Sequence, residues 1–118
     1  MMKKLFPTVL QQQHSTHSCS LLLDITADLH YFEGHFPAAP VLAGVAQLDW
    51  AVQFSQQLLF GNRPVIAVEM LKFQQMVQPG CQLTLILEQS KPDTSTFTYT
   101  CGERTVASGR FKWGPAHV

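Results

Sequence analysis

Charge is scarce in this sequence. Only 14% of its 118 residues are Asp, Glu, Lys or Arg, and eight basic residues balance eight acidic ones. A chain with zero net charge has no global field that would attract nucleic acid or an anionic membrane. We therefore expect a globular protein that binds no nucleic acid. The low charge also indicates that a partner subunit covers part of its surface.

Long apolar runs are missing as well. No stretch approaches the length that spans a bilayer, so no membrane span is expected. Residues 1–7 open with basic side chains, but Pro7 and the glutamines at 11–13 interrupt the apolar segment that a signal peptide needs. These features indicate a cytoplasmic protein.

Cysteine motifs are also absent. The three cysteines are Cys19, Cys81 and Cys101. They form no CxxC and no metal-ligand spacing, and their odd number argues against a disulfide scaffold. His14 and His17 lie three residues apart, but no further ligands cluster near them in the sequence. We expect reduced thiols and no metal.

The patterns that are present predict a single domain over residues 1–118, in which residues 1–13 form a loosely held arm. Residues 18–27 alternate polar and apolar side chains, which predicts a strand with its odd positions buried. A helix is predicted from Gly44 to the stop signal at Gly61. Further strands are predicted at 65–73, 81–88, 94–101 and 105–113. This order indicates an α+β fold, one antiparallel sheet curled about one long helix.

The predicted helix is apolar around most of its circumference. Val45, Leu48, Val52 and Leu59 form one stripe of it, and other faces are apolar too. Such a helix is largely buried rather than lying on a surface. Asp49 is the only charged residue between positions 44 and 60, and Gln53 lies four residues later on the same face. An acid in this setting is a candidate proton donor.

His35 is the second candidate for acid–base chemistry. It follows Gly34 and precedes Phe36 and Pro37, so it is expected on a rigid, non-helical approach to the helix. Imidazole gains or loses a proton near neutral pH. The backbone N–H groups of Gly44 and Val45 start the helix and can polarise a carbonyl group.

These three elements fit one reaction. A base removes a proton α to a carbonyl, the helix amides stabilise the enolate-like oxygen, and an acid protonates a β-hydroxyl group that leaves as water.

The segment from His35 to Asp49 resembles the active-site stretch of the β-hydroxyacyl-[acyl-carrier-protein] dehydratases of the hotdog fold. The matching residues are His35, Phe36, Pro37, Pro40, Val41, Gly44, Val45 and Asp49, with Gln53 and the turn Pro79-Gly80 beyond them. In that family the histidine of an HFP motif and an acid fourteen residues later form the catalytic pair. The resemblance covers roughly residues 30–113.

The resemblance implies a hotdog homodimer, or a higher homo-oligomer, with its sites at the subunit interface. By similarity, His35 is the base, Asp49 is the acid, and the Gly44 amide binds the thioester carbonyl. The implied substrate is carried on the 4′-phosphopantetheine arm of an acyl carrier protein, so no cofactor or metal is needed. The product is a trans-2-enoyl thioester for fatty-acid, polyene or polyketide-type biosynthesis.

The chain departs from the family pattern at two positions. Ala43 stands where the family usually has proline before the helix glycine, and Ala38 stands where it has glycine after the HFP motif. The short chain is similar to the compact dehydratases of aryl-polyene clusters.

Two other functions fit the same fold. One is a hotdog acyl thioesterase, in which Asp49 directs water at the thioester, but such enzymes generally lack the HFP histidine. The other is a non-catalytic, acyl-binding subunit of a heteromeric dehydratase. A carrier protein would bring an acidic surface to basic residues. The candidates are Arg63, Lys72, Arg104, Arg110 and Lys112.

Overall fold

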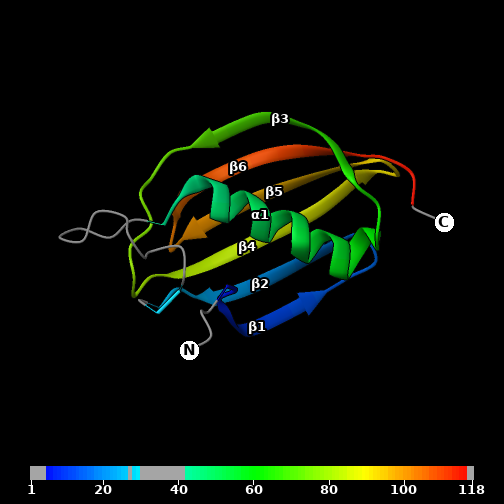
Figure 1. Ribbon diagram of the computed structural model, residues 1–118. Coiled ribbons are helices and arrows are strands. Elements are labelled where there is room, and N and C mark those ends of the chain that lie inside the picture. The colour runs from blue at the N-terminus through cyan, green and yellow to red at the C-terminus, as the bar shows by residue number, and fades with distance from the viewer. Residues whose placement is uncertain (1–4, 27, 30–41, 117–118) are drawn as a thin grey trace.

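The computed structural model describes residues 5–26, 28–29 and 42–116. Within them, six strands form one sheet in the order β1-β2-β4-β5-β6-β3, and every neighbouring pair is antiparallel (Figure 1). The strands are β1 (Thr8–His14), β2 (Ser18–Asp24), β3 (Val65–Phe73), β4 (Gln82–Lys91), β5 (Thr94–Cys101) and β6 (Arg104–Trp113).

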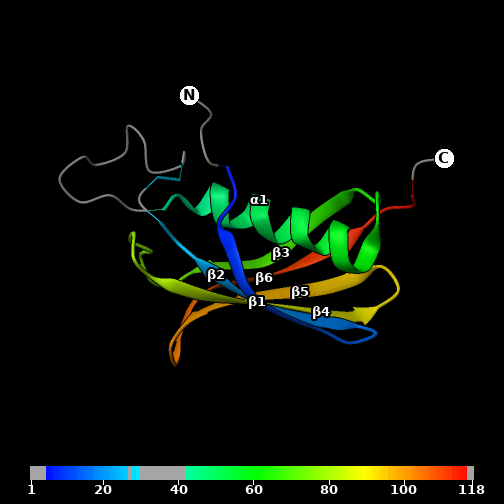
Figure 2. The ribbon, with the colours of Figure 1, turned by 90° about the horizontal axis from the view of Figure 1, so that it is seen from below.

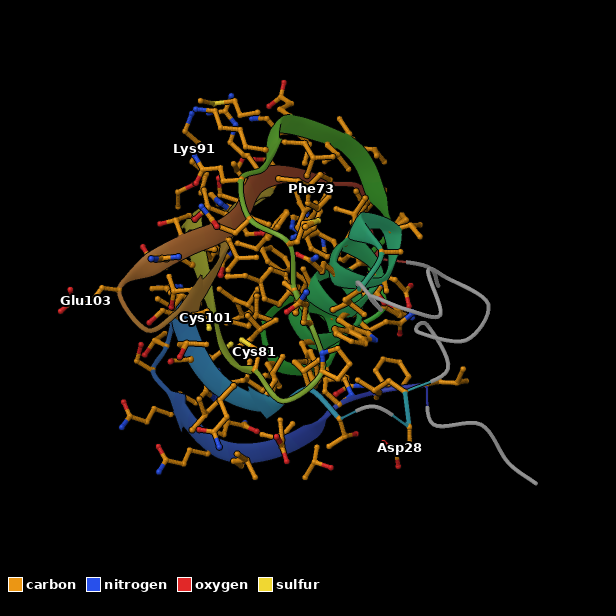
Figure 3. All side chains as sticks on the ribbon, turned by 90° about the vertical axis from the view of Figure 1, so that its left-hand side faces the viewer. Asp28, Phe73, Cys81, Lys91, Cys101 and Glu103 are labelled. Carbon is orange, nitrogen blue, oxygen red and sulfur yellow. The ribbon has the colours of Figure 1, made fainter. Side chains whose placement is uncertain are left out.

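The helix lies across one face of this sheet. It consists of α1 (Gly44–Ser55) and a π-helical continuation, η2 (Gln56–Phe60). Gly61 ends it with a φ of 66°, a left-handed conformation that glycine adopts without strain. Figure 2 shows α1 on one side of the sheet, and the end-on view of Figure 3 shows the sheet curling around it. Of the described helices, none has the length and hydropathy required to cross a bilayer.

Alternating side chains of the strands build the core beneath the helix. The buried apolar residues from the sheet are Cys19, Leu21, Leu23, Leu83, Leu85, Leu87, Phe97, Tyr99, Val106, Ala107, Phe111 and Trp113. They meet Ala46, Trp50, Ala51 and Phe54 of α1. The odd positions of β2 are therefore buried as the alternation predicts, and the α+β hotdog arrangement is confirmed.

The expectation of a loose arm at residues 1–13 is wrong for its second half. Thr8–His14 forms β1, an edge strand paired with β2, although all seven side chains are exposed. Backbone hydrogen bonds to β2 hold this strand without an alternating apolar pattern. The residues before it are also attached, because the indole Nε1 of Trp50 donates to the Leu5 carbonyl at 2.9 Å and Phe6 packs against Phe54.

Arg63, three residues after the end of η2, hydrogen-bonds to the turn before β5 and to the end of β6. Its Nε donates to the Gly114 carbonyl at 2.7 Å, and its other guanidinium nitrogens donate to the carbonyls of Pro92 and Trp113. The guanidinium also lies 5.5 Å from the centre of the Phe60 ring. The planar, always-charged donor fork of arginine suits this arrangement.

We expect Arg63→Ala to lower the free energy of unfolding by about 2 kcal/mol, because three carbonyl groups lose a charged donor. The matched control is Lys91→Ala, at an exposed position, which should change it by less than about 0.5 kcal/mol. Urea denaturation at one fixed protein concentration measures both. Equal stability of the two variants would show that the Arg63 contacts contribute nothing.

Candidate active site

The predicted site residues divide between two segments. Asp49, Gln53, Gly44 and Val45 lie on α1. The catalytic candidate His35 and the supporting Phe36, Pro37 and Pro40 fall within residues 30–41, outside the described part of the chain. The structure therefore locates Asp49 and the helix start, and the catalytic roles of all these residues stay predictions.

One face of the helix packs fully on its own sheet, and the described residues cover the other face only in part. Ala46, Trp50 and Ala51 are fully buried against the strands. Val45, from the stripe named above, is 71% exposed, and Leu48 is half-buried. The expectation of a largely buried helix is confirmed, since Val45 and Gln57 are the exposed residues between positions 44 and 60. Leu48, Val52 and Leu59 of the stripe pack against the core, so Val45 is the member that the described residues leave uncovered.

Asp49 lies on the border between these two faces. Its side chain is half-buried, as is that of Gln53. The phenol of Tyr99, buried on β5, donates to the Gln47 carbonyl at 2.6 Å. Burial, and then the negative charge of Asp49, raise the pKa of Tyr99 well above its usual value. The Asp49 carboxylate is therefore close enough to the core for its charge to affect the ionisation of Tyr99.

Gln47 is a buried polar residue of the same helix. Its side chain is 3% exposed, and its Oε1 has no hydrogen-bond partner among the described residues. A buried acceptor of this kind is costly unless something donates to it. Neither Gln47 nor Tyr99 was identified from the sequence as part of the site. The available signal was a polar residue two positions before Asp49 in an apolar helix.

The helix start is open to an acceptor. Ala43 precedes it in an extended conformation and has no side-chain oxygen that could cap it. The N–H groups of Gly44 and Val45 have no acceptor inside the helix, since the first turn has no preceding carbonyls. The Phe73 ring approaches so closely that a Cβ on Gly44 would lie 2.8 Å from its Cζ. Glycine at this position therefore admits an aromatic ring against the first turn.

The outer strand β3 continues the exposed apolar surface. Its edge carries no strand neighbour among the described residues. Ile66 is 67% exposed and Met70 65% exposed, and Phe73 is exposed where it meets Gly44. Unpaired edges with apolar side chains pair readily with another chain. Met70 lines a hollow with Thr96, Thr98 and Ser108 on the other face of the sheet. The apolar surface at the helix start is therefore defined here by Val45 and Phe73.

The basic residues predicted to meet a carrier protein have different roles. Arg63 binds carbonyls within the chain, Arg110 pairs with Glu69 at 3.1 Å, and the Lys112 ammonium donates to Thr94. Within the described residues, no side-chain partner is assigned to Lys72 or Arg104, and both are exposed. No cluster of three His, Cys, Asp or Glu side chains suitable for a metal occurs in the described ranges.

Comparison with known proteins places this site in context. The family model described as "ApeI-like: ApeI dehydratase" matches residues 11–110. A chain of the dehydratase heterocomplex ApeI:P from Xenorhabdus doucetiae is 33% identical, with a TM-score of 0.87 over 92% of this chain and 98% of that chain. An uncharacterized protein from Erwinia carotovora subsp. atroseptica is 34% identical, with a TM-score of 0.81 over 93% and 97% of the two chains.

Curated relatives agree in kind but are more distant. The 3-hydroxyacyl-[acyl-carrier-protein] dehydratase FabZ of Levilactobacillus brevis is 26% identical over 88% of this chain and 78% of its own length. Seven further dehydratases of that name match over 46% to 60% of their length. The chain thus spans about half the length of most curated relatives that it matches.

Proposed function

Because the chain belongs to the ApeI-like dehydratase family, we propose that it removes water from a (3R)-3-hydroxyacyl group carried on an acyl carrier protein. The observation that carries this proposal is the position of Asp49, the one charged residue between positions 44 and 60, which is half-buried at the border of the helix face that packs on the sheet. The open first turn of the same helix lies about one and a half turns away from it.

In the proposed reaction, the side chains move protons and no cofactor takes part. His35 removes the proton at C2 of the acyl thioester. The N–H groups of Gly44 and Val45 stabilise the negative charge that develops on the thioester oxygen. Asp49 gives its proton to the 3-hydroxyl group, the C3–O bond breaks, and water and a trans-2-enoyl thioester are formed.

The remaining predicted site residues support these steps. Phe36, Pro37 and Pro40 restrict the backbone around His35, since proline fixes its own φ and disfavours helix at the preceding residue. Gln53 follows Asp49 by one helical turn and can hold its carboxyl group in place.

A second subunit would complete the site. The apolar surface of Val45 and Phe73 is exposed and borders the helix start, and the edge of β3 has no strand neighbour among the described residues. A homodimer that pairs across this surface would exclude water from Asp49. We propose that each site uses His35 of one copy and Asp49 of the other. We also propose that the enzyme acts in the cytoplasm.

A heteromeric dehydratase is the second candidate. It is favoured by the similarity to a chain of the ApeI:P heterocomplex. In this case the same surface would bind a different hotdog chain, and the present chain would contribute only part of the site or only acyl binding. The presence of both His35 and Asp49 favours a catalytic role.

We expect His35→Ala and Asp49→Asn each to lower kcat for dehydration by about 10²- to 10⁴-fold, the usual contribution of a positioned acid or base. The assay follows loss of water from a panel of 3-hydroxyacyl carrier proteins by mass spectrometry. Circular dichroism and Tm confirm that each variant is folded.

The matched controls are His17→Ala and Glu88→Gln, at exposed positions on the turn after β1 and on β4. Both should retain the wild-type rate. A near-normal rate in either site variant would remove that residue from the mechanism. Release of the free acid in place of water would instead identify a thioesterase, and activity only after addition of a second hotdog chain would identify the heteromeric enzyme.

Two exposed basic residues of this chain, Lys72 and Arg104, are available to bind the carrier protein. Lys72 pairs in register with Ser108 on β6, and Arg104 begins that strand four residues earlier, so they lie about 13 Å apart along it. Both lie toward the end of the sheet where Phe73 meets Gly44. We propose that they attract the acidic carrier protein.

Reversing these charges with Lys72→Glu and Arg104→Glu should raise KM for the acyl carrier protein by about tenfold together and leave kcat unchanged, because rim charges mainly govern encounter. The control is Lys91→Glu. Lys91 is the last residue of β4 and lies at the end of the sheet away from Lys72 and Arg104. The KM effect should shrink as salt is added. If Lys91→Glu raises KM as much as the double variant, the docking surface is not at this end.

A further inference from the structure

Two thiol groups meet at the end of the sheet beneath the helix start. Cys81 lies directly before β4, and Cys101 is the last residue of the neighbouring strand β5. Their Sγ atoms are 2.7 Å apart, although twenty positions separate them in the sequence. Figure 3 shows the two side chains together at this end of the molecule.

The pair is accessible to small reagents. Both cysteines are half-buried and line a cavity of about 310 Å³. The other described residues that line it are Gln75, Met76, Val77, Gln78, Pro79, Arg104 and Val106. Because Gln75, Met76 and Gln78 are exposed, this cavity opens to solvent beside the thiols.

We propose that Cys81 and Cys101 form an oxidation site, at which a small-molecule disulfide such as oxidised glutathione converts the two thiols to an intramolecular disulfide. One cysteine thiolate attacks the reagent, forms a mixed disulfide and releases one reduced thiol. The second protein thiolate then attacks the mixed disulfide at the protein sulfur and releases the other. The two cysteines lose two electrons and two protons, and the reagent gains them.

The geometry requires little rearrangement. A disulfide bond is about 2.05 Å long, so the sulfurs need to approach by less than about 1 Å. Cys81 lies three residues before Thr84, and Cys101 directly follows Thr100, with which Thr84 pairs in the β4–β5 ladder. The closed loop would contain the whole of β4, the turn that follows it and β5.

The local chemistry makes this oxidation slow at neutral pH. Burial raises the pKa of Cys81 to about 12, and the hydrogen bond and charge of Cys101 add to the effect. Among the described residues that line the cavity, Arg104 is the one charged side chain, and Cys101 is the other titratable group. Since the thiolate is the reactive species, oxidation should accelerate as the pH rises.

A disulfide here would stabilise the segment that hydrogen-bonds to the residues before α1. The Val77 carbonyl accepts from the N–H of Leu42, two residues before α1, at 2.7 Å. The Cys81 carbonyl accepts from Ile25 at 3.0 Å. Oxidation would therefore join β5 to the segment that contacts both the approach to α1 and the end of β2.

Cys19 provides an internal control. It is buried on β2 opposite Leu87, and burial raises its pKa to about 11. Leu87 is six residues from Cys81 along β4, so Cys19 lies about 20 Å from the pair. It cannot form a disulfide with either member in the folded chain.

The experiment exposes dilute reduced protein to oxidised glutathione at neutral and at mildly alkaline pH. The protein is then denatured, its remaining thiols are alkylated with N-ethylmaleimide, and its intact mass is measured. We expect the wild type to lose two alkylation sites without gaining glutathione, and to do so faster at the higher pH. The Cys19→Ser variant should behave in the same way.

Cys81→Ser and Cys101→Ser should each keep their remaining thiols or carry one glutathione. The proposal is overturned if the wild type keeps three alkylation sites after prolonged exposure. It is also overturned if either single variant still forms an internal disulfide, or if the oxidised wild type is a covalent dimer on a non-reducing gel. The two single variants test the pair independently, should one of them fold poorly.

Discussion

The packing of α1 against the concave face of the sheet determines where every other feature lies. Trp50 is fully buried and hydrogen-bonded to Leu5, while the small side chains of Ala46 and Ala51 let the helix approach the strands. These contacts fix the rotation of the helix about its axis. This rotation places Asp49 at the edge of the helix face that packs on the sheet, and Val45 outside it. The described part of the chain therefore only half encloses a site on α1.

Much of the fold could be predicted because its strands alternate clearly, as at Leu83, Leu85 and Leu87. β1 could not, since its glutamine run has no alternation and its stability comes from backbone pairing with β2. Helical periodicity also failed to select the packed face, because α1 is apolar nearly all round. The role of Arg63 depends on carbonyls about thirty and fifty positions away, which no local pattern reveals.

The candidate site was predicted in part. Asp49 was identifiable as the one charge in an apolar helix, and the structure places it half-buried on α1. Tyr99 and Gln47 were missed, because a tyrosine in an alternating strand and a glutamine in a helix have ordinary core or surface roles. The histidine motif lies outside the described residues, so its part in the site depends on the family and on the proposed second subunit.

Subunit complementation tests the shared site most directly. His35→Ala and Asp49→Asn proteins, each inactive, are unfolded together, refolded as a mixture and assayed for dehydration. If each site combines His35 of one copy with Asp49 of the other, half of the dimers are mixed and each has one intact site, so about a quarter of the wild-type activity should return. Mixed dimers that form, as native mass spectrometry would show, but remain inactive would contradict a site built from two copies of this chain.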